Sequence, residues 1–116
     1  MHATTAHVPA LSATPDADRI RHALAPIAEL PDADAVALYL DAHDYRGERG
    51  CPGECPIAVM ILKLSTLDNI TVTGIMAYVV GPDYKMSGVV ELPLPVRMFV
   101  QRFDGHQYDS LVSAGA

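Results

Sequence analysis

Several features that would place a chain of this length in a familiar class are missing from the sequence. No apolar run approaches the roughly 18 residues needed to span a bilayer, and no positively charged apolar leader opens the chain. With only two cysteines among 116 residues, these absences argue against a membrane or secreted protein. They favour a cytoplasmic setting, in which thiols are reduced by default.

Clusters of basic residues are also missing. The chain has eight basic and fourteen acidic residues, which gives a net charge of −6. The pairs Arg19/Arg21 and Arg46/Arg49 are each interspersed with or flanked by acids. Proteins that bind nucleic acid usually carry a basic patch, because contacts to phosphate supply most of the affinity. The composition argues against nucleic acid as a partner, and an acidic surface that mimics DNA stays open as an alternative.

Common catalytic motifs are missing as well. The sequence has neither the Gly-x-Ser-x-Gly motif of serine hydrolases nor the Gly-Lys-Ser/Thr of phosphate-binding loops. Its paired aspartates lie at helix starts or at positions expected to face solvent. The sequence therefore shows no complete catalytic constellation and leans against an enzyme.

The residues that are present describe a globular chain. Half of them are apolar and 19% are charged, and a domain of this size buries about two thirds of its unfolded surface without help from disulfides or metals. We expect a mobile arm over residues 1–14 that includes His2 and His7. A single domain over 15–112 and a frayed tail over 113–116 should follow.

Two helices are expected in the first part of the domain. Thr14-Pro15-Asp16 and Leu30-Pro31-Asp32 each combine the proline and acid typical of a helix start. Pro26 should kink the first helix or end it, because proline removes a donor and clashes with the preceding turn. The second helix should run to about Asp44, with Gly47 as a left-handed cap.

A third helix is expected from Pro56 to about Leu67. It is apolar on nearly all sides, which indicates a central position. A strand should then run from Ile70 to Val80, with a bulge or a bend near Gly74, where the alternation of apolar residues changes parity.

A return strand and a last helix complete the pattern. The loop 81–88 and a strand over 89–92 form a β-hairpin with the preceding strand. Val96, Phe99, Val100 and Phe103 then recur at helical spacing. Gly105 ends this helix, and one more helical turn is expected over 108–112.

This order of elements predicts an α+β fold with three N-terminal helices, one β-hairpin and one C-terminal amphipathic helix. A two-stranded hairpin is marginal alone, so it must pack on the helices or pair with another chain through its open edge. The predicted core consists of Ile57, Met60, Ile61, Leu64, Val72, Val79, Phe99, Val100 and Phe103.

Thiol chemistry is the first candidate for a site. If Pro56 is the first helical residue, Cys55 occupies the cap position, where the helix dipole and free amides lower the pKa of a thiol. Cys51 could then act as a resolving thiol. The spacing is looser than Cys-x-x-Cys, and Glu48 and Glu54 oppose a thiolate. Because of its cap position, Cys55 is a weak candidate for a catalytic residue. The alternative is that it is a small buried packing residue.

Zinc is the second candidate. A closed zinc site needs four ligands, and the residues available are Cys51, Cys55, His43 and His106. The sequence has no second paired ligand motif beside the two cysteines. Cys55 with either histidine is also the only nucleophile and base combination that the sequence pattern favours. No other cofactor is expected.

Two groups of motifs mark the region from about Ala35 to Val112. The first is Gly47-x-x-Gly50 followed by Cys55-Pro56-Ile57-Ala58 and Leu62; the second is Val90-x-Leu92-Pro93, then Phe99-Val100-x-x-Phe103-Asp104-Gly105 with Tyr108, Leu111 and Val112. Together they resemble a family of short proteins from actinobacterial genomes and their phages. That family has no assigned activity, so the resemblance implies a cytoplasmic setting and no catalytic residue. It also implies a single cysteine before the proline, which makes Cys51 an extra and weakens the thiol and zinc interpretations.

The function predicted from the sequence is a small non-catalytic protein–protein interaction or regulatory module. Its partner would be another protein or a second copy of the chain. The first alternative is a thiol-redox or zinc-binding protein that uses Cys51 and Cys55. The second is a regulator that binds nucleic acid or mimics DNA.

Overall fold

The computed structural model describes residues 10–113, and the predicted α+β class is confirmed. A three-stranded antiparallel sheet in the order β1-β2-β3 replaces the predicted two-stranded hairpin. The elements are η2 (Leu11–Ala13), α1 (Pro15–Ala28), α2 (Ala33–Ala42), α3 (Pro56–Leu64), β1 (Thr71–Val72), β2 (Met76–Val80), β3 (Met86–Glu91), α4 (Leu94–Asp104) and η3 (Asp109–Leu111).

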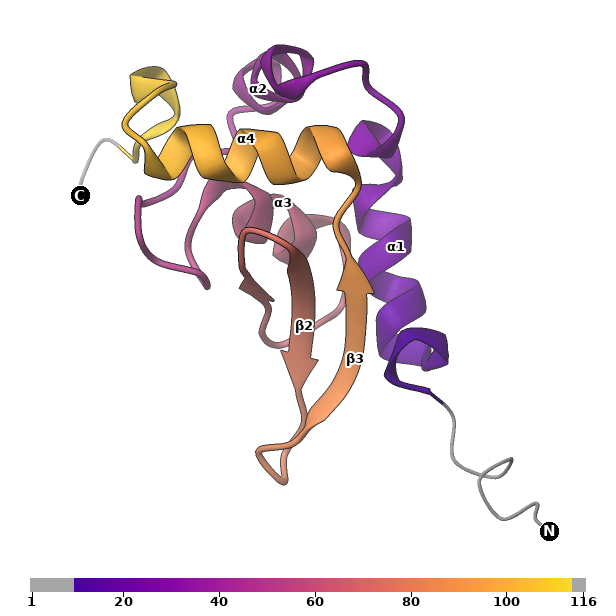
Figure 1. The fold of residues 1–116 in the computed structure, drawn as a ribbon. Coiled ribbons are helices and arrows are strands. Elements are labelled where there is room, and N and C mark those ends of the chain that lie inside the picture. Colours follow the sequence, from indigo (N-terminus) through magenta and orange to yellow (C-terminus); the bar gives the residue numbers. More distant parts are fainter. Residues whose placement is uncertain (1–9, 114–116) are drawn as a thin grey trace, which may run out of the picture.

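The helices gather on one side of the sheet. In Figure 1, α1 runs beside β3, α4 crosses the upper ends of the strands, and α2 lies beyond α4, away from the hairpin. Their apolar faces meet in one core around Phe99 and Phe103. Every residue of the predicted core is buried except Leu64, whose side chain is 41% exposed. Its inclusion was wrong because α3 ends at Leu64, one turn earlier than expected, and Ser65 is already extended.

The predicted start of the first helix is confirmed, whereas the second helix begins slightly later than predicted, at Ala33, with Asp32 as its N-cap. The Thr14 side chain accepts a hydrogen bond from the backbone N–H of Ala17, and the Asp32 side chain accepts one from Ala35. Of the two effects predicted for Pro26, the end of the first helix near Leu24 is contradicted, because α1 continues through Pro26 to Ala28. The ring of Pro26 lies on the exposed side of the helix, while the buried side chain of Ile27 holds the last turn against the core.

The end of α2 also differs from the prediction. The helix stops at Ala42, and the residue with left-handed backbone is Asp44, with φ of 59°. Aspartate tolerates this conformation because its short side chain bonds locally. Gly47 is therefore not the cap, and its backbone is not left-handed. A glycine is needed there for another reason, since a Cβ would lie 2.2 Å from the carbonyl oxygen of Glu54.

The long strand predicted from Ile70 to Val80 is split in two. The Thr73 hydroxyl accepts hydrogen bonds from the backbone N–H groups of Ile75 (3.1 Å) and Met76 (3.0 Å). This local bonding closes a turn, so the parity change near Gly74 marks a reversal of the chain rather than a bulge. The register irregularity lies instead at Val79 and Val80, opposite β3.

Both outer strands of the sheet make hydrogen bonds with other segments, so the open hairpin edge predicted from the sequence is partly occupied. On β1, the N–H of Val72 donates to the carbonyl of Pro52 at 2.8 Å. On β3, the Thr14 hydroxyl donates to the carbonyl of Ser87 at 2.7 Å, and η2 packs against this strand.

The residues of the predicted arm that the structure describes are thus part of the fold, whereas His2 and His7 lie outside the described residues. Of the predicted tail, only Ser113 is described, and its N–H donates to the carbonyl of Gly47.

Candidate functional site

The loop between α2 and α3, which holds both cysteines, is fastened to the segment after α4. Gly47 forms a parallel bridge with Val112, and its N–H donates to the carbonyl of Leu111 at 2.9 Å. Arg49 donates from Nε to the carbonyl of Phe103 (2.6 Å), and its guanidinium lies 5.0 Å from the centre of that ring. A second group, Nη2, reaches the Asp109 carboxylate at 2.7 Å.

Arg46 is occupied in a similar way. Its guanidinium contacts Asp41 at 3.2 Å and Asp44 at 2.7 Å, and it also donates to the carbonyl of Ser110. The two arginines that the sequence places near the thiols therefore hold the loop in place. They are not free to stabilise a thiolate.

Cys55 lies at the N-cap of α3, as predicted, but in an environment that opposes ionisation. Its side chain is 4% exposed and makes no capping hydrogen bond. Burial raises the pKa of the thiol to about 11, and this effect outweighs the backbone amides of Ala58 and Ile57, which lower it. The expected lowering of the pKa is therefore contradicted, and the buried packing role describes Cys55.

This raised pKa should be visible in the pH dependence of stability. The thiol stays protonated in the folded state up to about pH 11 but ionises in the unfolded state near its ordinary value of about 8.5. Above about pH 8.5 the unfolded state therefore binds fewer protons than the folded state. The contribution of the Cys55 thiol to the free energy of unfolding is present below about pH 8.5 and is lost as the pH rises toward 11. We expect denaturation of wild type between pH 8 and 11 to show an extra loss of up to about 1.4 kcal/mol per pH unit. The Cys55→Ala variant should lack this extra loss. Identical slopes of unfolding free energy against pH in wild type and variant would contradict the raised pKa of Cys55.

Cys51 and Cys55 do line a common hollow of about 170 Å³ between the loop, β1 and α4. Both are free thiols, and Cys51 is partly exposed. Neither histidine lines this hollow: His43 stacks on Tyr39 with ring centres 4.1 Å apart, and His106 is an exposed residue with φ of 70° after α4. Within residues 10–113, no three His, Cys, Asp or Glu side chains form a metal-binding group. The structure thus does not assemble the four predicted zinc ligands.

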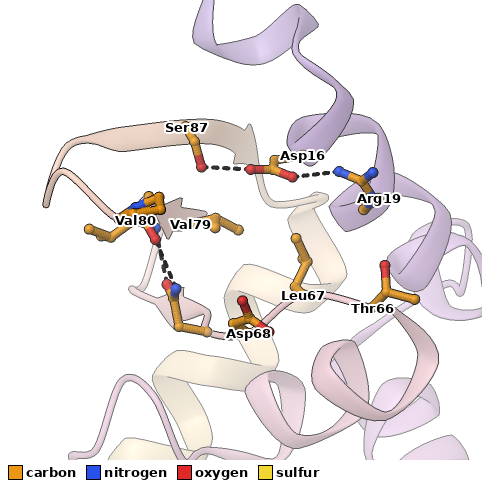
Figure 2. Close-up of a pocket in the computed structure, with 11 residues that line it drawn as sticks. Asp16, Arg19, Thr66, Leu67, Asp68, Val79, Val80 and Ser87 are labelled. Atoms are coloured by element: carbon orange, nitrogen blue, oxygen red, sulfur yellow. Dashed lines mark hydrogen bonds and ion pairs between the residues drawn. The ribbon is translucent and has the colours of Figure 1, made fainter.

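A polar pocket of about 290 Å³ lies where α1 meets the hairpin, and no sequence motif indicated it. Figure 2 shows the Asp16 carboxylate between the Ser87 hydroxyl, which donates to it at 2.6 Å, and the Arg19 guanidinium, also at 2.6 Å. The close approach depends on Gly88, where a Cβ would lie 2.6 Å from the backbone nitrogen of Ala17. Asp16 and Ser87 are 71 residues apart, so no local pattern could have paired them.

Several polar groups of this pocket already make hydrogen bonds or ion pairs within the protein. Asp16 uses both carboxylate oxygens. Asn69 uses both ends of its amide, donating to the carbonyl of Val80 at 2.8 Å and accepting from its N–H at 3.0 Å. The arrangement fixes α1 and the loop before β1 to the turn end of the hairpin, so its evident role is structural.

The outer face of the sheet is a different kind of surface. Side chains on β2 and β3 alternate between the buried inner face and a partly exposed outer face. Tyr78 pairs with Val89 and Val80 pairs with Met86 across the two strands. We call the following set the apolar sheet face: Met76, Tyr78, Val80, Met86 and Val89.

Nothing in the described part of the chain covers this face. In Figure 1 the strands lie in front of the helices, with no element on the viewer's side of them. Ile75, just before β2, and Tyr84, in the loop after it, are also exposed. An antiparallel sheet that packs one face on a core commonly carries polar residues on the other, and here the central positions are apolar.

Comparisons with known proteins give no match: none of the family models fits the chain, and no curated protein or solved structure is similar to it. Among residues 10–113, no helix combines the length and the apolar character required to cross a bilayer.

Proposed function

We propose that this protein is a small protein-interaction module that binds an amphipathic helix of another protein on its apolar sheet face. The observation that supports the proposal is the apolar outer surface of β2 and β3, which no described element covers. Burial of such surface is the main source of affinity in protein association. The absence of a charged residue from the central pair, Tyr78 and Val89, also keeps the desolvation cost of binding low.

The dimensions of the face favour a helix as its occupant. Strands of five or six residues are about 17–20 Å long, and the two strands that form the face span about 10 Å, which gives a footprint of roughly 180 Å². A stable dimer interface buries about 800 Å² per partner, so this face is too small to hold a second copy by itself. One helix is about 10 Å wide and would cover the face as a second layer.

Photocrosslinking tests the proposal. Tyr78 is replaced by benzoylphenylalanine, and the chain is irradiated in the cells that naturally produce it. The matched control places the same group at Tyr45, a partly buried tyrosine in the loop between α2 and α3. We expect a discrete adduct at position 78, with the crosslinked residues of the partner at helical spacing, and no such adduct at position 45.

A second variant separates binding at the face from chance contact. Val89→Lys places a charge beside position 78 on the neighbouring strand and should abolish the adduct without changing the thermal unfolding curve by more than a few degrees. Adducts of equal yield at positions 78 and 45 would contradict the proposal. So would an adduct of twice 12.4 kDa alone, which would identify a second copy.

A further inference from the structure

A second hollow, of about 300 Å³, lies between α2 and η3. Its floor is formed by the buried residues Ala37 and Leu111, and Tyr108 and Ser110 contribute from η3 and the residue before it. Leu38 stands at its border with 71% of its side chain exposed, although it lies in the middle of a helix. In Figure 1 this region is at the opposite end of the molecule from the hairpin tip.

Two carboxylates border the hollow, and each has one oxygen to spare. Asp34 Oδ1 accepts from the Tyr108 hydroxyl at 2.6 Å and lies 3.8 Å from Arg102. Asp41 Oδ1 contacts Arg46 at 3.2 Å. Within residues 10–113 no partner is found for the second oxygen of either group, and the two side chains are 74% and 50% exposed.

The spacing of these carboxylates selects the shape of an occupant. Asp34 and Asp41 are seven residues apart on α2, which corresponds to about 10.5 Å along the helix axis. Residues on one face of a strand recur at about 6.6 or 13 Å, and neither distance matches. A second helix alongside α2 repeats the same rise, so its residues i and i+7 lie opposite the two carboxylates.

We infer that the hollow between α2 and η3 is a docking site for a basic amphipathic helix of a partner protein. Lysine or arginine at positions i and i+7 binds the free oxygens of Asp34 and Asp41, and an apolar side chain at i+3 or i+4 fills the hollow beside Leu38. This is the helix-in-groove mode of recognition. A second copy does not fit, because its own α2 would bring acids against acids in a chain of net charge −6.

This surface is independent of the proposed function, since it lies on another part of the molecule and selects a partner by charge. Exposed ion pairs contribute little affinity by themselves, so the apolar contact supplies most of the binding energy. The carboxylates set the orientation and favour basic partners. Binding is therefore expected to weaken, but not to vanish, at high salt.

A designed peptide tests the inference. The probe is a fluorescein-labelled alanine-based helix of about 18 residues with lysines at i and i+7 and leucines at i+3 and i+4; in its matched control both lysines are glutamates. Titration with the full-length protein, followed by fluorescence anisotropy, should show at least about tenfold tighter binding of the lysine peptide. Equal affinities for the two peptides would overturn the inference.

Protein variants then locate the site. Leu38→Ala and Asp41→Asn should each weaken binding of the lysine peptide several-fold. Asp68→Asn removes the same charge from an exposed position beside the polar pocket and should leave the affinity within twofold. An effect of Asp68→Asn equal to that of Asp41→Asn would show attraction to net charge alone and would overturn the inference. Val89→Lys should leave peptide binding unchanged, so failure at this site is distinguishable from failure of the proposed function.

Discussion

Replacement of Phe99 by alanine is expected to lower the free energy of unfolding by about 3–5 kcal/mol. Phe99 is fully buried, and its ring stacks on Phe103 and Tyr108 with centres 5.8 and 5.3 Å away. Its removal leaves a cavity at the point where α4 meets the segment that follows it, and neighbours held in other contacts cannot collapse into it. Urea denaturation followed by circular dichroism measures the change.

Leu64→Ala is the matched control for this cavity. The sequence pattern places Leu64 in the same core, but its side chain is 41% exposed at the end of α3. We therefore expect a loss of less than about 1 kcal/mol, because little apolar area returns to water. A loss as large as that of Phe99→Ala would mean that α3 continues further and buries Leu64.

Gly47→Ala is expected to destabilise the protein by about 3 kcal/mol, at the upper end of the usual range for forced overpacking. The added Cβ would lie 2.2 Å from the carbonyl oxygen of Glu54 and 2.6 Å from the nitrogen of Pro56. Both are backbone atoms, so no side chain can rotate away. The loop would have to move, which would break the hydrogen bonds of Gly47 with Leu111 and Ser113.

Gly53→Ala provides the comparison within the same loop. The nearest atom to a Cβ at Gly53 is the carbonyl oxygen of Ile70 at 3.5 Å, an ordinary contact. Its effect on the free energy of unfolding should stay within about 1 kcal/mol. Thermal and urea unfolding of the two variants together separate a steric effect at Gly47 from a general cost of losing loop glycines, and equal losses would contradict the steric explanation.

Features with local causes could be predicted from the sequence. A hydroxyl before a helix caps it through a hydrogen bond three residues away, so Thr14 could be identified directly, and the acid Asp32 marked the start of the second helix to within a residue or two. The stripe from Val96 to Phe103 repeats at the helical period and is buried as expected. The position of Cys55 at the start of α3 follows from Pro56 in the same way.

Features that depend on distant segments could not be predicted. The cap position of Cys55 suggested a reactive thiol, but the burial that raises its pKa depends on the way the core closes around it. Gly47 was expected to supply a left-handed turn, whereas it is needed because another backbone segment passes close by. Alternation along β2 places Met76, Tyr78 and Val80 on one side, but whether a helix covers that side depends on how distant segments pack, so the apolar sheet face could not be identified.

The anchoring of the cysteine loop has a consequence for the order of events during synthesis. The groups that hold Arg49 lie 54 to 60 residues further along the chain, and Gly47 is bonded to Leu111 and Ser113. On the ribosome, these partners emerge only after every other helix and strand described here has been made. Until then the nascent chain carries an unfastened loop with Cys51, so residues 103–113 complete the anchoring of a segment made several seconds earlier.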